Sequence, residues 1–135
     1  MPKNGKNVRM PYPTIGAARQ AVVAAREKLV TLKKPRQAAE DAWIGAVTVV
    51  RAALRCNGKD WHSTKGVMPR FREFLKASKS PMTLADDLSF LAGSLHGSCF
   101  YAGVPEACDV NAVEGGIRAV ERFIQDASVY CKRAR

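Results

Sequence analysis

The sequence predicts an all-α protein, an antiparallel up-and-down four-helix bundle with one additional short helix. Five segments repeat apolar residues at the i, i+3, i+4 spacing of a buried helical face, and no segment alternates with the period of two that is typical of a strand. Residues that form turns separate these segments by short connections, which favours antiparallel neighbours.

The first two helices meet at Pro35. The first is expected to begin near Thr14, a plausible N-cap, and to end before Pro35, which suits the first turn of the second helix. The turn "CNGK" at 56–59 ends the second helix. The expected buried lines are Ile15, Ala18, Val22, Ala25, Leu29 and Leu32 in the first helix and Ala39, Trp43, Val47, Val50 and Leu54 in the second.

The second half of the chain predicts a short helix and two long ones. Ser80 is the expected cap of the third long helix, and Asn111 with Glu114 is the expected capping box of the last. The expected buried residues are Val67, Phe71, Phe74 and Leu75 in the short helix, Leu84, Leu88, Leu91, Leu95 and Cys99 in the third long helix, and Val113, Ile117, Val120, Ile124, Ala127 and Cys131 in the last.

The length of 135 residues fits one domain, with residues 1–13 as a flexible basic arm and 14–135 as the bundle. No apolar run approaches the length of a membrane span or a signal peptide, so we expect a cytoplasmic protein without a membrane segment. The four cysteines, at 56, 99, 108 and 131, could form disulfides. A cytoplasmic location favours free thiols that act as small apolar residues.

The formal net charge of +10 is concentrated towards the N-terminus: nine Lys or Arg face one acid in residues 1–36, while acids exceed bases in 80–135. This asymmetry is compatible with an anionic partner such as nucleic acid, bound without sequence preference. A solvated face, attraction between the two ends of the chain and complementary subunits are the alternatives. The candidate contact residues are Lys3, Lys6, Arg9, Arg19, Arg26, Lys33, Lys34 and Arg36.

The two histidines are the candidates for chemistry. His96 lies three residues before Cys99, but a thiol near the C-terminal end of a helix lacks the electropositive surroundings of a reactive cysteine. His62 shares a loop with Asp60 and Lys65, where a turn in which Ser63 or Thr64 caps the short helix is favoured over acid–base or phosphate chemistry. No spacing typical of a metal site and no phosphate-binding loop is present, so we expect no metal or cofactor.

Three stretches carry a resemblance to a known superfamily. They are "AAEDAWIGAVTVVRAAL", the polar "KDWHSTKGVMPRFREFL", and "LHGSCFYAGVPEACDVNAVEGGIRAVERFI" with "HGSCFYAG" at the end of a helix. This succession, over residues 14–132, resembles the HEPN superfamily of prokaryotic helical bundles, in its branch of small stand-alone domains.

The resemblance implies a homodimer, and a protein partner from a paired bacterial system such as one with a nucleotidyltransferase-type component. Catalytic members are ribonucleases that use an arginine and a histidine with four to six residues between them. Here the stretch before His96 contains no arginine, while Arg55 and His62 have six residues between them but lie elsewhere in the chain. The sequence therefore predicts a non-catalytic binding or interaction module, with His96 as a packed or interface histidine. Nucleic-acid binding and a degenerate ribonuclease using Arg55 and His62 are the alternatives.

Overall fold

The computed structural model describes residues 12–63 and 65–133, and every regular element in this part of the chain is helical. The elements, in chain order, are α1 (Ile15–Val30), α2 (Pro35–Cys56), α3 (Val67–Ala77), α4 (Thr83–Leu91), the π-helix η1 (Ala92–Tyr101), α5 (Val110–Ala127) and α6 (Val129–Arg133). The predicted all-α class is confirmed.

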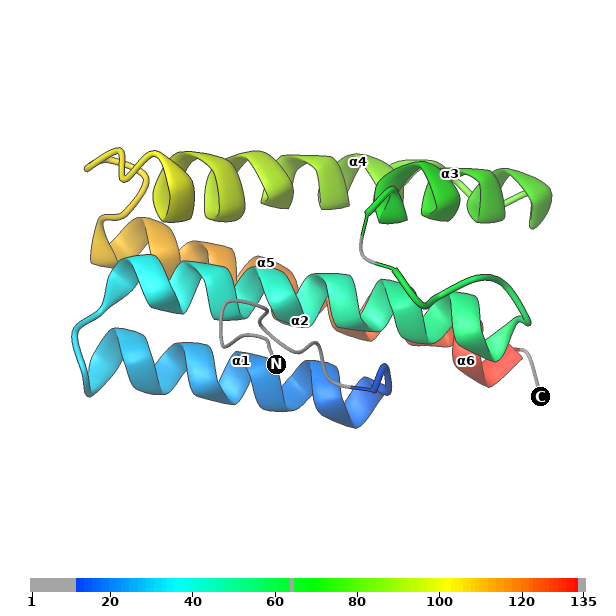
Figure 1. Cartoon of the computed structure of the whole chain (residues 1–135), viewed down its shortest axis with the longest axis horizontal. Helices are drawn as coiled ribbons and strands as arrows, with labels where there is room; N and C mark the ends of the chain where they lie inside the picture. Colours follow the sequence, from blue (N-terminus) through cyan, green and yellow to red (C-terminus); the bar gives the residue numbers. More distant parts are fainter. Residues whose placement is uncertain (1–11, 64, 134–135) are drawn as a thin grey trace, which may run out of the picture.

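Four long rods lie side by side, and each runs opposite to the one before it (Figure 1). They are α1, α2, α4 continued by η1, and α5 followed by α6. The short helix α3 lies at one end of the bundle, and the α1–α2 turn lies at the other (Figure 1). Helix α2 packs against α1, α5 and η1, so most of its length is buried.

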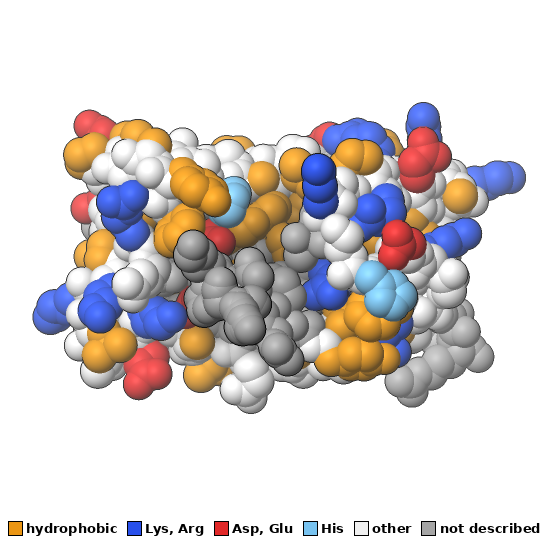
Figure 2. All heavy atoms as spheres, in the orientation of Figure 1, with side chains coloured by type: hydrophobic (Ala, Val, Ile, Leu, Met, Phe, Trp, Pro, Cys, Tyr) orange, Lys and Arg blue, Asp and Glu red, His pale blue; other side chains and the backbone are white. Residues whose placement is uncertain are grey.

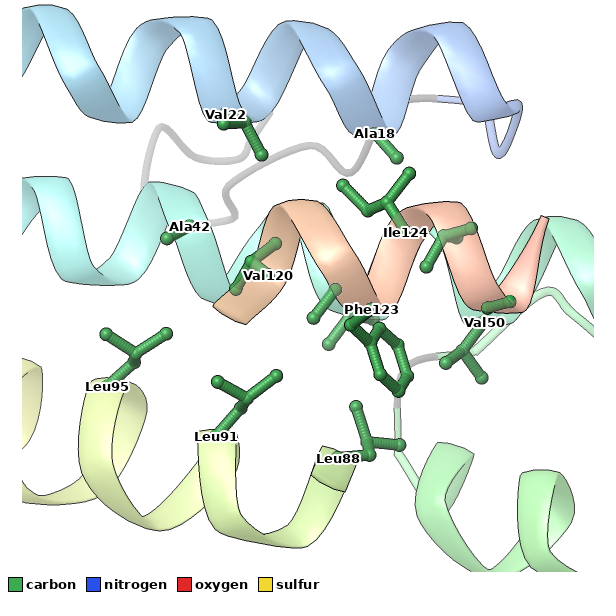
Figure 3. Close-up of a cluster of buried hydrophobic side chains, with 14 of the residues drawn as sticks. Ala18, Val22, Ala42, Val50, Leu88, Leu91, Leu95, Val120, Phe123 and Ile124 are labelled. Atoms are coloured by element: carbon green, nitrogen blue, oxygen red, sulfur yellow. The ribbon is translucent and has the colours of Figure 1, made fainter. Parts of the chain in front are cut away.

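The core is formed where apolar faces of the four rods meet. In Figure 3, the side chains of α1, α2, α4, η1 and α5 point towards one another from all sides. Phe71, Leu88 and Ile117 are almost completely buried in this core. Burial of such side chains is the main favourable contribution to folding. The periodic apolar residues of the sequence thus account for most of the packing.

Helices α1 and α2 approach closely because small residues line their contact. A Cβ atom added to Gly45 would lie 3.1 Å from the backbone oxygen of Ala18. Thr14 caps α1 as predicted, since its hydroxyl accepts a hydrogen bond of 2.9 Å from the Ala17 N–H. The prediction for Leu32 is wrong: α1 ends at Val30, and Leu32 is 49% exposed.

Three predicted caps are wrong. Helix α4 begins at Thr83, whereas the Ser80 N–H donates to the Leu75 oxygen beyond the end of α3. The cap of α5 is Asp109, whose carboxylate accepts a hydrogen bond from the Asn111 N–H, so Asn111 is not the cap. The Glu114 side chain accepts from Arg26 and Arg118 instead of forming a capping box. The hydroxyl of Ser63 accepts from the Lys65 N–H, while Gly66 precedes α3. Thr64 lies outside the described residues.

The prediction of free thiols is wrong, because all four cysteines are paired. Cys56 at the end of α2 bonds to Cys131 in α6, and Cys99 in η1 bonds to Cys108 before α5. The Cα atoms are 5.2 and 4.9 Å apart, within the usual range for a disulfide. The first pair is 75 residues apart in the chain, so only the return of the last rod beside α2 brings it together.

None of the helices in 12–63 and 65–133 combines the length and the apolar character that crossing a bilayer would demand.

Candidate functional site

The π-helix η1 interrupts the α-helical rod that the sequence predicts through Cys99. Short π segments inside helical rods are frequent at functional sites. Two contacts fix the end of η1: the Cys99–Cys108 disulfide and the side chain of Arg36. The Arg36 guanidinium donates to the carbonyl oxygens of Phe100, at 2.7 Å, and Tyr101, at 3.2 Å. Arg36 therefore satisfies carbonyl groups that the last turn of a helix leaves without partners.

His96 projects from η1 towards α2. Its Nδ1 lies 2.7 Å from Oε1 of Glu40, and its ring lies 5.7 Å from that of Trp43 and 4.8 Å from that of Tyr101. The centres of the Phe100 and His96 rings are 6.1 Å apart. The sequence predicts a packed or interface histidine at this position, and two-thirds of the His96 side chain is covered within the chain.

These side chains border an open cavity of about 320 Å³ between α2, η1 and the start of α3. We call the cavity, together with the Tyr101 and Phe100 rings that contact His96 beside it, the His96 groove. Both histidines of the chain are visible on the face shown in Figure 2, each beside hydrophobic side chains. The cavity is lined by Glu40, Trp43, Ile44, Val47, Gly66, Val67, Met68, Pro69, Ala92 and His96.

The lining contains one hydrogen-bonded histidine–glutamate pair and otherwise apolar groups. A histidine oriented by a carboxylate is a familiar general base, yet none of the described residues that line this cavity offers a hydroxyl, thiol or amine as its nucleophile. Cys99, the cysteine nearest to His96 in the sequence, is held in a disulfide. The arrangement is better suited to receiving an apolar or aromatic group than to covalent chemistry.

Sequence reasoning missed Glu40, Trp43 and the capping role of Arg36. The useful pattern was the spacing of Glu40 and Trp43, which are three residues apart and so share a helical face. Nothing in the sequence indicated that this face would meet His96, 56 residues further along.

The predicted basic surface is divided among different environments. Arg26 lies between two glutamates of α5, 3.1 Å from Glu114 and 2.7 Å from Glu121. The Glu121 hydrogen bond, more than any other contact, raises the pKa of the Arg26 guanidinium. Arg19 lines a shallow groove between α1 and α5.

Lys33 and Lys34 are exposed at the α1–α2 turn, and neither forms an ion pair with any described residue. Lys3, Lys6 and Arg9 lie outside the described residues. The nucleic-acid surface stays a prediction.

Arg55 and His62 have separate partners. The Arg55 Nε donates to the Pro13 oxygen at 3.0 Å, and the guanidinium carbon lies 5.0 Å from the centre of the Tyr12 ring. His62 interacts with Asp60 at 3.3 Å and stacks on Trp61. Tyr12 and Pro13, the last residues of the predicted arm, thus lie against the bundle.

In residues 12–63 and 65–133, no three His, Cys, Asp or Glu side chains converge as a metal site. Comparisons with protein-family models, curated proteins and solved structures found no match for the chain.

Proposed function

We propose that this chain is a non-catalytic, HEPN-like interaction module that associates with a second copy of itself through the His96 groove. The observation that carries this proposal is an exposed aromatic side chain beside an open apolar cavity. Tyr101 is 68% exposed at the edge of the groove, whose volume is about 320 Å³. Because an apolar cavity of about 150 Å³ already accepts a benzene ring, an aromatic side chain fits this volume.

The segment that forms the groove edge is unusually free of charge. Residues 88–105 contain no Asp, Glu, Lys or Arg, in a chain of which 25% is charged. Depletion of charge and exposed aromatic rings are typical of the centre of a protein interface. A two-fold pairing would let Tyr101 of each copy enter the groove of the other, since such an interface uses the same surface twice.

The described residues that line the cavity itself carry no hydroxyl, thiol or amine, which supports a binding role over catalysis. The HEPN-like character rests on the sequence resemblance, to which the observed all-α bundle adds only the fold class. The paired cysteines favour an oxidising compartment over the cytoplasmic location expected from the sequence.

Light scattering after size exclusion tests the association. At about 100 µM, well above the micromolar dissociation constants of weak complexes, we expect a mass twice the 14.7 kDa of one chain. Tyr101→Ser is expected to return the protein to the monomer mass. Phe90→Ser is the matched control, because Phe90 is an equally exposed aromatic residue, at 72%, in the same rod but borders a different cavity, between that rod and α5.

A wild-type monomer at this concentration would contradict the proposal, and so would a Phe90→Ser variant that dissociates as readily as Tyr101→Ser. Far-UV circular dichroism of each variant separates a lost interface from a lost fold.

A further inference from the structure

We propose that the end of the bundle formed by α2 and the following loop binds single-stranded nucleic acid by stacking an unpaired base on the rings of Tyr12, Trp61 and His62. We call these three side chains the aromatic column. This site is separate from the His96 groove and from the basic surface predicted from the sequence, so it does not depend on the proposed self-association.

The rings of the column are in contact with one another. Trp61 and His62 stack with their centres 4.2 Å apart and their planes inclined by 20°. Tyr12 meets Trp61 edge to face at 5.2 Å. Because 75% of the His62 side chain is exposed and Tyr12 is 61% exposed, the column presents ring surface to solvent. A base could therefore extend the stack on His62.

Arginines hold the column in place. The Arg51 Nε donates to the Trp61 oxygen at 2.8 Å, and its guanidinium lies over the Trp61 ring at 5.7 Å. Arg55 takes the equivalent position over Tyr12 at 5.0 Å. Arg70 donates to the backbone oxygens of Ser63 and Lys65. The rings are thus positioned before a ligand arrives, which reduces the entropy lost on binding.

The surroundings of the column are positively charged. Residues 51–70 contain five Lys or Arg and one acid, Asp60. Arg55, Lys59 and Lys65 form no ion pair with a described residue. Hydrogen bonds from His62, first from its backbone N–H, lower the pKa of Asp60. Asp60 and Glu73 line a cavity together with Lys59 and Arg70, so two carboxylates lie among these cations. Lys and Arg side chains are prominent around this end of the face in Figure 2, beside a hydrophobic patch.

These two properties together select the ligand. Cations alone would attract any anion, and an acidic peptide would leave the rings unused. An apolar partner would leave the cations unused. A single strand offers unpaired bases to stack on the rings and phosphates for the cations, and single-strand binding sites combine these two features. In a duplex the bases are already stacked, so the column has little to bind.

Fluorescence anisotropy of a labelled 12-nucleotide DNA strand of mixed sequence, titrated with the full chain, tests the proposal. His62→Ala is expected to weaken binding on the order of tenfold, the usual effect of removing one stacking ring. His62→Phe keeps a flat ring and is expected to restore most of the affinity. A matched duplex is expected to bind more weakly than the single strand at the same salt concentration.

Two double variants with equal charge locate the contact. Lys59→Ala with Lys65→Ala removes two cations beside the column, and Lys33→Ala with Lys34→Ala removes two at the opposite end of the bundle. Each phosphate contact contributes about 0.7 to the salt slope on a single strand. We expect the first variant to lower that slope by about 1.4, the sum of two contacts, and the second to leave it unchanged.

Three results would overturn the proposal: no binding by the wild type at low salt, equal affinity of His62→Ala and the wild type, or a larger loss from the Lys33 and Lys34 variant. Equal binding of a polyglutamate chain would also count against it, since that ligand has charge but no bases.

Discussion

Leu95 of η1 packs directly on Gly116 of α5. A Cβ atom added to Gly116 would lie 2.6 Å from Cδ2 of Leu95, whereas one added to Gly115 would meet nothing within 4 Å. Because Leu95 is itself only 2% exposed, it has little room to move aside.

The two glycines should therefore respond oppositely to alanine. Gly115→Ala is expected to raise the free energy of unfolding by up to about 1 kcal/mol, because alanine favours the helix. Gly116→Ala should be less stable than Gly115→Ala by about 1–3 kcal/mol, the usual cost of overpacking a core. Urea denaturation of both variants measures the difference. Equal stabilities would contradict the packing.

The disulfide between Cys56 and Cys131 should stabilise the fold more than the one between Cys99 and Cys108. For sequence separations of 75 and 9 residues, the chain-entropy relation gives about 4.5 kcal/mol for the longer loop and about 2.6 kcal/mol for the shorter. Serine pairs that replace each disulfide, compared by urea denaturation, test this order. The Cys99 and Cys108 pair serves as the control for loss of two cysteines.

A thiol count tests the pairing itself. In the denatured wild type, a thiol reagent should label no cysteine before the disulfides are reduced. After reduction it should label all four cysteines. Thiols that react before reduction would show that a pair is open in the isolated protein.

Glu114 should make stability depend on acid pH. Its hydrogen bond with Arg118, and then that with Arg26, lower the pKa of this carboxyl group in the folded chain. The folded state thus favours the charged form, so the stabilisation is complete above the ordinary pKa of 4.5 and is lost as the pH falls.

Melting temperatures from pH 7 to pH 3 test this expectation. The wild type should melt above Glu114→Gln at pH 7, and the difference between their melting temperatures should shrink as the pH falls from 4.5 towards 3. Glu106→Gln, at an exposed position without an ion pair among the described residues, should follow the wild type throughout. A constant gap between the wild type and Glu114→Gln would contradict the assignment.

Glu40 should hold η1 against α2 through His96. Removing a hydrogen bond of this kind costs about 1 kcal/mol. Glu40→Ala and His96→Ala should each lower stability, while the double variant should cost less than the sum of the two. A double-mutant cycle in urea measures this coupling. Additive losses would show that the 2.7 Å contact contributes nothing to the fold.

The sequence by itself determined the helices and most of their buried residues, because helical periodicity and prolines act locally. The cap at Thr14 and the helix start at Pro35 are local features of this kind. The wrong caps at Ser80 and Asn111 have different reasons. The Ser80 N–H bonds locally to the Leu75 oxygen at the end of α3, whereas the Glu114 side chain is held by Arg26 of α1, 88 residues away in the chain.

Only the tertiary structure decided which side chains meet. The sequence analysis could not pair His96 with Glu40, Cys56 with Cys131, or Tyr12 with Trp61, since 49 to 75 residues separate the partners. Periodicity specifies which face of a helix is buried, but it carries no information on which other helix covers that face. The candidate sites of this protein are built from such distant pairs, and their geometry therefore depends on how the rods pack.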